Sequence, residues 1–553
     1  MTRAETHGPF DLLLIAGTVL TPDAIETGGR SGRTAVAIRD GIIVGVASES
    51  EAIASDWAAA AAEVLDLGEA TVSAGFVDAH IHPIIGLQLT RGLDLSGITE
   101  REDARSAIAA YVADRPAEEE WILAWGLDPA VFEGGEFGNE LLAGVDGGRK
   151  LYITLFDGHS ALASAAAIEA AGVRGDEVFP DASALGLDAD GRPNGMLYEF
   201  SAQQLVLPHI PGLTFEDRVR LLADLLGGMA STGIVAGQML DLMAEDSFDL
   251  LEELERRQDL PIRLRISPSV FPGFTAEDLE RHLRYQELAG RRWYARGVKL
   301  MIDGTIDNGT AWLFEPDTKG ESTQSLWLDP AEYREAVRFF HEHGIPTTTH
   351  AIGDKGVAFV AETLASLPAS DVQHRIEHIE TLPDEVLDEI IASGAAASMQ
   401  PTHCTLFTRA DHTDNWSQRL GAERADRAWR TRDLRDRGAI LTLGSDWPIA
   451  PYDPRGIVAA AQLRRPAGQE EVEPVRPDQS LSARAALEGY TSEYWRSVGE
   501  PGGRIEPGLP ADLTVWSRNP LTTDPDEFAG SEVLLTVVGG VPWVRDVSGA
   551  HAP

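Results

Sequence analysis

From about residue 216 onward, short apolar runs alternate with longer amphipathic stretches. Seven of these apolar runs lie at 233–240, 261–269, 297–304, 344–353, 374–380, 395–403 and 439–447. Their lengths and β-branched content predict strands, and the 3.6-residue periodicity between them predicts helices. With an earlier run that ends at His82 they make eight strands. Strands that alternate with helices predict a parallel sheet, and eight such units are what a (β/α)8 TIM barrel requires.

Both ends of the chain have the pattern of antiparallel β-structure instead. Residues 11–70 contain apolar runs around an Asp40-Gly41 hairpin signal, with one alanine-rich helix predicted from Glu51 to about Ala62. Residues 511–517 and 533–547 are again β-like, and a Gly-Gly turn separates the last two runs. The simplest assembly pairs these segments, which predicts a small β-sandwich domain built from both chain termini.

These patterns divide the chain into an α/β barrel and a split β-domain. We expect residues 1–70 to form the N-terminal part of the β-sandwich, residues 71–495 the barrel, and residues 496–553 the C-terminal part. The segment 84–226 breaks the regular alternation, with helices predicted near 100–114 and 161–171 and a strand near 150–157. An insertion of this length is more plausibly a cap over a substrate site than a linker.

Charge and cysteine content narrow the class of partner and the compartment. A formal net charge of -42 argues against nucleic acid and against an anionic membrane surface, since both would repel the chain. Apolar runs long enough to span a bilayer are absent, and the N-terminal run lacks the basic flank of a signal peptide. The single cysteine, Cys404, fits a reducing compartment. We therefore expect a cytoplasmic protein.

Candidate metal ligands stand at the carboxyl ends of the predicted barrel strands. His80 and His82 end the first strand two residues apart, so both side chains leave the same face, roughly 7 Å from each other. Further strands end in other titratable side chains, namely Lys299, His350, His378 and Asp446. Barrel chemistry takes place at this end of the strands, and imidazole with carboxylate suits a divalent ion. The sequence therefore predicts a metal site there.

The motifs that surround these residues resemble a known family. DxHxH on strand one, VK on four, THAIGD on five, RIEH on six, QPTH on seven and GSDWP on eight are similar to the metal-dependent amidohydrolase superfamily. The similarity is closest to its amidohydrolase-3 branch, which includes N-substituted formamide deformylases. Two positions depart from the pattern. Ala74 stands where the family usually has proline, and Gln238-Met239 stand where relatives often have His-Asp.

The resemblance implies a ligand set and a cofactor. His80, His82 and Asp446 would bind one Zn2+ ion, and His350 and His378 would bind a second. Burial beside cations disfavours a protonated lysine, and binuclear relatives resolve this by carboxylating the lysine to a carbamate that bridges both ions. We expect the same of Lys299. The alternative is a Lys299 that pairs with Asp303 or another acid beside a single ion.

The resemblance also implies a reaction, namely hydrolysis of a carbon–nitrogen bond that is not a peptide bond. Metal lowers the pKa of its bound water, so that hydroxide can attack a carbonyl at neutral pH. Asp446 would serve as general base and return the proton to the departing amine. The expected substrate is a small-molecule linear amide, such as an N-substituted formamide or a related N-acyl compound. The alternatives are a cyclic-amide hydrolase, a deaminase, or a non-catalytic binding or regulatory member.

The substrate pocket is predicted less sharply from sequence. His159, in FDGHS, resembles a family element that could bind the substrate carbonyl, and the alternative is a buried structural histidine. His403 in QPTH is predicted to end strand seven and face the same opening. Trp125 could form an apolar wall, although core packing is the default for tryptophan. A serine hydrolase is disfavoured because no GxSxG motif surrounds the candidate serines. A homodimer is implied by the resemblance alone.

Overall fold

Two ladders of parallel strands form the centre of the chain. A computed structural model describes residues 10–29, 31–132, 137–241 and 246–543. The first ladder has the order β16-β15-β14-β7, and the second has the order β17-β18-β19-β20-β21. The first ladder consists of β7 (Phe76–Ile81), β14 (Ile234–Met239), β15 (Arg263–Ile266) and β16 (Trp293–Ala295). The second consists of β17 (Val298–Met301), β18 (Thr347–Ala351), β19 (Arg375–His378), β20 (Ala396–Met399) and β21 (Leu441–Leu443).

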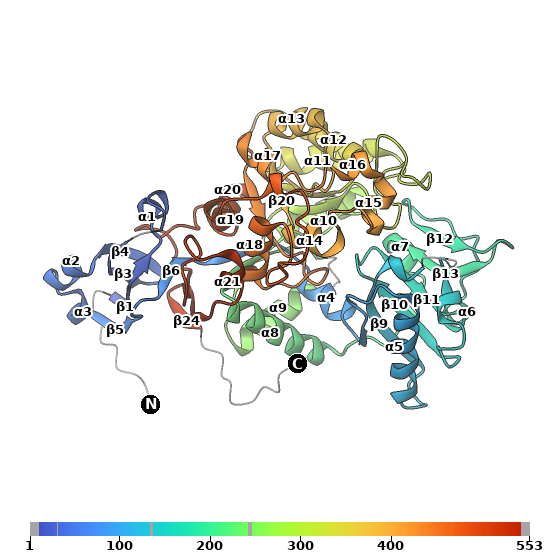
Figure 1. The fold of residues 1–553 in the computed structure, drawn as a ribbon, viewed down its shortest axis with the longest axis horizontal. Helices are drawn as coiled ribbons and strands as arrows, with labels where there is room; N and C mark the ends of the chain where they lie inside the picture. Colours follow the sequence, from blue (N-terminus) through green and yellow to red (C-terminus); the bar gives the residue numbers. More distant parts are fainter. Residues whose placement is uncertain (1–9, 30, 133–136, 242–245, 544–553) are drawn as a thin grey trace.

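Isolated pairings connect the two ladders at both of their edges. Ser269 pairs in parallel with Lys299, and Ile81 pairs in parallel with Trp447. Each of the eight apolar runs predicted as barrel strands contains one strand of the ladders, which confirms them as strands and confirms that they are parallel. The result is a mixed α/β, TIM-barrel-like fold (Figure 1).

Helices with clear sequence signals connect the strands. They include α8 (Phe215–Ser231), α9 (Ser247–Arg257), α10 (Ala276–Tyr285), α11 (Pro330–Glu342), α12 (Asp354–Ala365), α13 (Asp384–Ser393), α17 (Thr431–Asp436) and α18 (Pro454–Leu463). In α11 the Asp329 side chain accepts the Ala331 N–H, with proline at the first turn, as a helix start requires. Gly394 ends α13 at a φ of 70°, where only glycine is unstrained.

Strands from both chain ends form two further sheets. One has the order β4-β3-β1-β5, and the other has the order β2-β6-β22-β23-β24. Their strands are β1 (Phe10–Ala16), β2 (Thr18–Val19), β3 (Thr34–Arg39), β4 (Ile42–Ser48), β5 (Ala61–Asp66), β6 (Thr71–Ala74), β22 (Leu513–Trp516), β23 (Val533–Val538) and β24 (Val541–Trp543). Leu12 and Val36 of the first sheet share one buried cluster with Val72, Leu513 and Val537 of the second. Distant segments of sequence therefore fold against each other, as the β-rich termini predicted.

Two predicted helices differ from the structure. The helix expected from Glu51 to Ala62 is two short helices, α2 (Glu49–Ala54) and α3 (Trp57–Ala60), and β5 already begins at Ala61. The break falls at Asp56, which takes a left-handed φ of 54° that an α-helix cannot continue through. The helix expected near 161–171 begins only at Ala165, because Ser164 caps α6 (Ala165–Ala171).

The segment after His82 forms a separate six-stranded sheet at the opposite end of the molecule from the terminal sheets (Figure 1). Its order is β12-β13-β11-β10-β9-β8. The strands are β8 (Leu93–Asp94), β9 (Trp121–Leu127), β10 (Lys150–Leu155), β11 (Ser160–Ala163), β12 (Ala184–Leu187) and β13 (Pro193–Tyr198). Helix α5 (Arg101–Asp114) confirms the helix predicted near 100–114.

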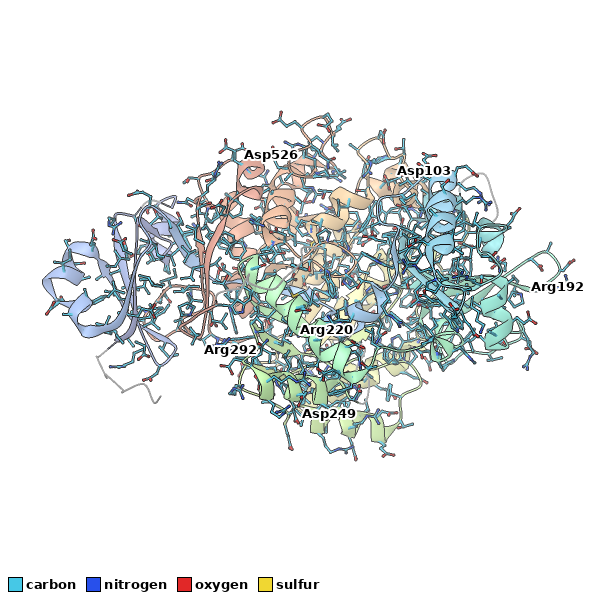
Figure 2. All side chains as sticks on the ribbon, turned by 90° about the horizontal axis from the view of Figure 1, so that it is seen from below. Asp103, Arg192, Arg220, Asp249, Arg292 and Asp526 are labelled. Carbon is cyan, nitrogen blue, oxygen red and sulfur yellow. The ribbon has the colours of Figure 1, made fainter. Side chains whose placement is uncertain are left out.

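The acidic surplus is carried on the surface. Asp103 and Asp249 are exposed and point outward from helices in Figure 2. Within the described residues, no helix combines the length and the apolar character needed to cross a membrane.

A buried tryptophan joins the terminal sheet to the first barrel strand. The Trp516 ring lies 4.8 Å from the Phe76 ring and 5.4 Å from the Phe528 ring, measured between centroids. Its Nε1–H donates to the Ser73 hydroxyl at 2.9 Å, and the side chain has no exposed surface. Trp516 therefore contributes directly to the packing of β22 against β7.

We expect Trp516→Ala to lower the free energy of unfolding by about 3–5 kcal/mol, because it leaves a large cavity and removes the hydrogen bond to Ser73. Urea denaturation followed by circular dichroism measures this change. The control is Val178→Ala at a position 94% exposed, which should change the stability by less than about 0.5 kcal/mol. Equal effects of the two substitutions would contradict the role given to Trp516.

Candidate metal centre

Three lone-pair donors converge at the end of β7. The Nε2 atoms of His80 and His82 lie 3.2 Å apart. Asp446, which follows β21, places Oδ1 3.3 Å from His80 Nε2 and 3.1 Å from His82 Nε2. His80, His378 and Asp446 offer ligand atoms that all lie within 4.8 Å of one another. The predicted strand-end residues are therefore brought to one point.

A buried carboxylate fixes the orientation of His80. The Nδ1 atom of His80 lies 2.7 Å from Glu377 Oε2, and both side chains are completely buried. Arg375 holds Glu377 at 2.9 Å and also donates to the Ala79 carbonyl. Burial holds the pKa of His80 well below its usual range, so the ring is neutral. A neutral His80 that donates from Nδ1 to Glu377 keeps a lone pair on Nε2, directed at Asp446.

Lys299 lies in the same buried space. Its Nζ is 3.3 Å from His80 Nε2, and burial lowers the pKa of the amine to about 8. Across the described part of the chain, no carboxylate forms an ion pair with Lys299 within 4.0 Å. Asp303, the suggested alternative partner, instead accepts the backbone N–H groups of Trp312 and Gly353. Near pH 8 the amine is therefore present in both its charged and its neutral form.

The remaining two predicted ligands stand beside this group. The rings of His350 and His378 lie 4.4 Å apart, and His378 lies 4.8 Å from His80. Burial holds the pKa of both His350 and His378 well below the usual range. His378 and Asp446 also adopt left-handed φ values of 74° and 60°. Such conformations cost about 1–3 kcal/mol each and cluster at functional sites, where they aim a side chain.

His159 enters the site from the inserted sheet. Its Nδ1 lies 2.9 Å from Glu199 Oε2, and its ring lies 4.9 Å from the ring of His350. Burial by itself would lower the pKa of His159, but the carboxylates of Glu199 and Asp157 outweigh it and raise the pKa to about 9. His159 is therefore held through Nδ1 by Glu199, and its side chain lines the small pocket beside the predicted ligands.

Two predicted pocket residues lie elsewhere than expected. His403 does not end a strand, because β20 stops at Met399 and Pro401 begins α14 (Pro401–Phe407). From this helix its Nε2 still approaches Asp446 Oδ2 to 3.8 Å. Trp125 lies on β9, but of the described residues on that strand it is Leu123 and Ala124 that line the neighbouring cavity.

Sequence reasoning missed the supporting carboxylates. Glu377 belongs to the RIEH motif and directly precedes His378 on β19. A glutamate next to a predicted ligand could have indicated that it supports the site. Asp241 lies 3.8 Å from His82 Nδ1 and accepts the N–H of Ile84 and of Ile85. These two hydrogen bonds hold the start of α4 (Pro83–Leu89) next to His82. Glu199 carries no local signal, because only the fold brings it to His159.

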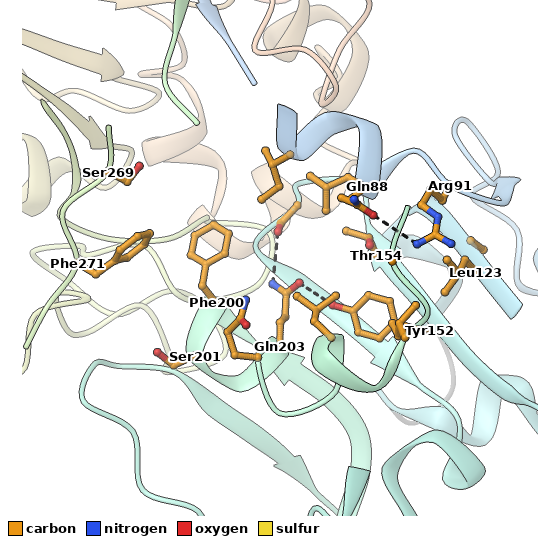
Figure 3. A pocket seen from close by; sticks show the side chains of 18 of the residues that line it. Gln88, Arg91, Leu123, Tyr152, Thr154, Phe200, Ser201, Gln203, Ser269 and Phe271 are labelled. Carbon is orange, nitrogen blue, oxygen red and sulfur yellow. Dashed lines mark hydrogen bonds between the residues drawn. The ribbon is translucent and has the colours of Figure 1, made fainter. Parts of the chain in front are cut away.

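A cavity connects this centre to solvent. A pocket of about 50 Å³ is lined by side chains of the centre, namely His82, His159, Lys299, His350, His378 and Asp446. It shares Ile85, Leu89, Gly158, Phe200 and Ser269 with a second cavity of about 930 Å³ between the inserted sheet and the strand ends (Figure 3). A small molecule can therefore approach the predicted ligands from this side.

Comparison with known proteins agrees with this geometry. A family model described as amidohydrolase family, of the amidohydrolase-3 type, matches residues 63–544. The chain belongs to this amidohydrolase family. YtcJ of Bacillus subtilis (strain 168) is 26% identical over 93% of this chain and 96% of its own length. The N-substituted formamide deformylase of Arthrobacter pascens is 23% identical over 96% of this chain and 98% of its own.

A solved structure supports the fold of this amidohydrolase. An uncharacterized metal-dependent hydrolase from Pyrococcus horikoshii OT3 superimposes with a TM-score of 0.68 at 23% identity. The superposition covers 93% of this chain and 99% of the other. The mixed α/β, TIM-barrel-like arrangement therefore follows a known architecture.

Glu377→Gln should weaken metal binding by this amidohydrolase by roughly 10–100-fold, because His80 loses the carboxylate that sets its tautomer. Competition with a chromophoric chelator measures the affinity. Glu385→Gln, an exposed change at the start of α13, is the matched control and should leave the affinity unchanged. Equal affinity of the Glu377→Gln variant and the wild type would show that Glu377 does not position the ligand.

Proposed function

We propose that the chain is a metal-dependent hydrolase of linear amides, acting on an N-substituted formamide or a related N-acyl compound. The observation that carries the proposal is the convergence of His80, His82 and Asp446 on one buried point below a solvent-connected cavity. Family membership supports hydrolysis, and the similarity to a formamide deformylase supports this class of substrate.

The residues present fit a divalent cation. Asp446 Oδ1, His378 Nδ1 and His403 Nε2 are buried polar atoms without a hydrogen-bond partner among the described residues. Unsatisfied buried groups of this kind cost about 1–3 kcal/mol each, and facing lone pairs repel one another. A cation removes both costs at once. Imidazole nitrogens with a carboxylate oxygen favour zinc.

We assign the ligands as the sequence predicted them. His80, His82 and Asp446 would hold one ion, and His350 and His378 would hold a second. Lys299 would bridge the two as a carbamate. Formation of the carbamate needs the neutral amine, whose nitrogen attacks CO2 to form an N–C bond and releases one proton. The pKa of about 8 leaves a usable neutral fraction at neutral pH.

The chain's own residues then carry the proton transfers. When bound, a divalent cation would lower the pKa of its water from about 15.7 towards 7 and would polarise the substrate carbonyl. Asp446 takes the proton of the attacking water at its carboxylate and delivers it to the leaving amine nitrogen. His159, held by Glu199, donates from Nε2 to the carbonyl oxygen as negative charge develops there. His403 lies near enough to Asp446 to orient its second oxygen.

The finer architecture belongs to the same proposal. We propose that the two parallel ladders close into a (β/α)8 barrel, that the terminal sheets form a β-sandwich, and that the domain limits are 1–70, 71–495 and 496–553. The cytoplasmic location, the homodimer and the absence of nucleic-acid and membrane partners stay predictions from the sequence.

Asp446→Asn should lower kcat for N-benzylformamide hydrolysis by about 10²–10⁴-fold, because an amide cannot accept the proton. Release of formate from the zinc-loaded enzyme measures the rate, and a thermal melt checks that the variant folds. Release of ammonia from an aminopyrimidine, with no formate released from the formamide, would favour the deaminase alternative. Bound zinc without any turnover of linear or cyclic amides would favour a binding protein.

Lys299→Met should reduce the zinc content from two ions per chain towards one, since the bridging ligand is lost. Elemental analysis after gel filtration in bicarbonate buffer measures this stoichiometry. Native mass spectrometry of the wild type should show the added mass of one CO2, which acid treatment removes. Two tightly bound ions in the Lys299→Met variant would contradict the bridging role.

A further inference from the structure

The large cavity has a different character from the metal centre beside it. It lies between β9, β10 and α7 (Glu199–Gln203) of the inserted sheet and helices α4 and α10 of the barrel side. Leu123, Tyr152, Phe200, Phe271 and Tyr285 give it a largely apolar and aromatic wall. Figure 3 shows Tyr152 and Phe200 facing the same space from the inserted segment. Apolar walls of this size accommodate an apolar substituent of a small molecule.

The charged residues of this wall are positive, whereas the protein as a whole has a negative net charge. The chain has 88 Asp and Glu against 46 Lys and Arg. Among the described residues that line the cavity, however, the charged side chains are Arg91 and Arg281, with no aspartate or glutamate. The wall therefore offers positive charge to a ligand within an acidic protein.

The two arginines differ in how they are held. Arg281 forms an ion pair with Asp278 one turn earlier on its own helix. Arg91 donates through one terminal nitrogen to the Pro211 carbonyl at 2.9 Å and to Gln88 Oε1 at 3.4 Å. No acid of the described chain lies within 4.0 Å of Arg91, and its side chain is half-buried. Two of its three nitrogens therefore remain available for a ligand.

We propose that Arg91 binds a carboxylate at the far end of the substrate, separated from the scissile amide by an apolar spacer. This inference rests on the proposed amide hydrolysis at the metal centre. A guanidinium pairs with a carboxylate through two parallel hydrogen bonds, which adds orientation as well as affinity. Burial strengthens such a pair, because surrounding apolar groups reduce screening by water.

The length of α4 sets the spacing between the two ends of the substrate. This helix begins immediately after His82, and Arg91 follows its last turn. The seven residues of α4 rise by roughly 10 Å along the helix axis at about 1.5 Å per residue, and Thr90 follows before Arg91. An α-amino acid carboxylate, which is bonded next to the amide nitrogen, would not reach. An aromatic spacer would, and it matches the ring faces of Tyr152 and Phe200.

The test compares N-(4-carboxybenzyl)formamide with its methyl ester on the zinc-loaded enzyme. We expect the wild type to prefer the carboxylate in kcat/KM by about ten-fold or more, as charge-assisted pairs provide. Arg91→Met should abolish this preference through KM, with turnover of the ester retained as evidence of folding. Arg91→Lys should keep part of it. Arg281→Met is the matched control and should keep all of it, because that guanidinium is already paired.

A second measurement separates this inference from the proposed reaction. The ketone 4-(3-oxobutyl)benzoate has no carbon–nitrogen bond to cleave, and calorimetry should show that Arg91→Met weakens its binding by about ten-fold or more. If neither formamide is hydrolysed but this Arg91-dependent binding persists, the proposed reaction fails and the carboxylate subsite stands. If both formamides are hydrolysed equally well, the reaction stands and the subsite is refuted. Binding of the ketone that does not depend on Arg91, or no binding, also refutes it.

Discussion

The structure depends on the close approach of imidazole nitrogens and a carboxylate oxygen in a mostly buried site. The Nε2 atoms of His80 and His82 and the Oδ1 atom of Asp446 approach one another to 3.1–3.3 Å, and Asp446 Oδ1 has no hydrogen-bond partner among the described residues. Such a group is unfavourable by itself, since Asp446 Oδ1 is buried without a hydrogen-bond partner among the described residues. The parallel ladders impose the arrangement, because strand ends that meet at one edge cannot move apart separately. The free energy of folding therefore maintains a site with an unpartnered buried oxygen, and a bound cation would offset that cost.

A surrounding set of buried charges keeps this arrangement specific. Arg375 and Glu377 are both almost fully buried, and together they connect β19, the Ala79 carbonyl and the His80 ring. A buried ion pair seldom adds net stability, because the desolvation cost approaches the Coulomb gain. Its value here is orientation, since it allows His80 only one tautomer. Asp241 acts comparably on the other side, where it fixes the start of α4 behind His82.

The sequence predicts the parts of the site that follow from local rules. Strand ends are set by apolar runs and by proline, and a parallel sheet places those ends together, so the sequence alone groups His80, Lys299 and Asp446. It misplaces His403 on a strand end, because Pro401 looks the same after a strand and at a helix start. The helix expected through Asp56 is wrong because composition does not reveal a left-handed residue. Glu199 and the large cavity depend on packing between segments far apart in sequence, which no local pattern encodes.

The division between barrel and insertion suggests how selectivity is set. The predicted metal ligands lie at the ends of the parallel strands, whereas Tyr152 and Phe200 of the cavity wall come from the inserted segment. Helix α4 connects the predicted metal site with the cavity, since it begins directly after His82 and ends two residues before Arg91. A substitution on the inserted sheet can therefore change what fits without moving a ligand, while a change in α4 alters both together. On this argument the residues of the inserted sheet can differ between enzymes that act on different substrates. The length of α4 cannot, because it would set the distance between the reacting bond and the far end of the substrate.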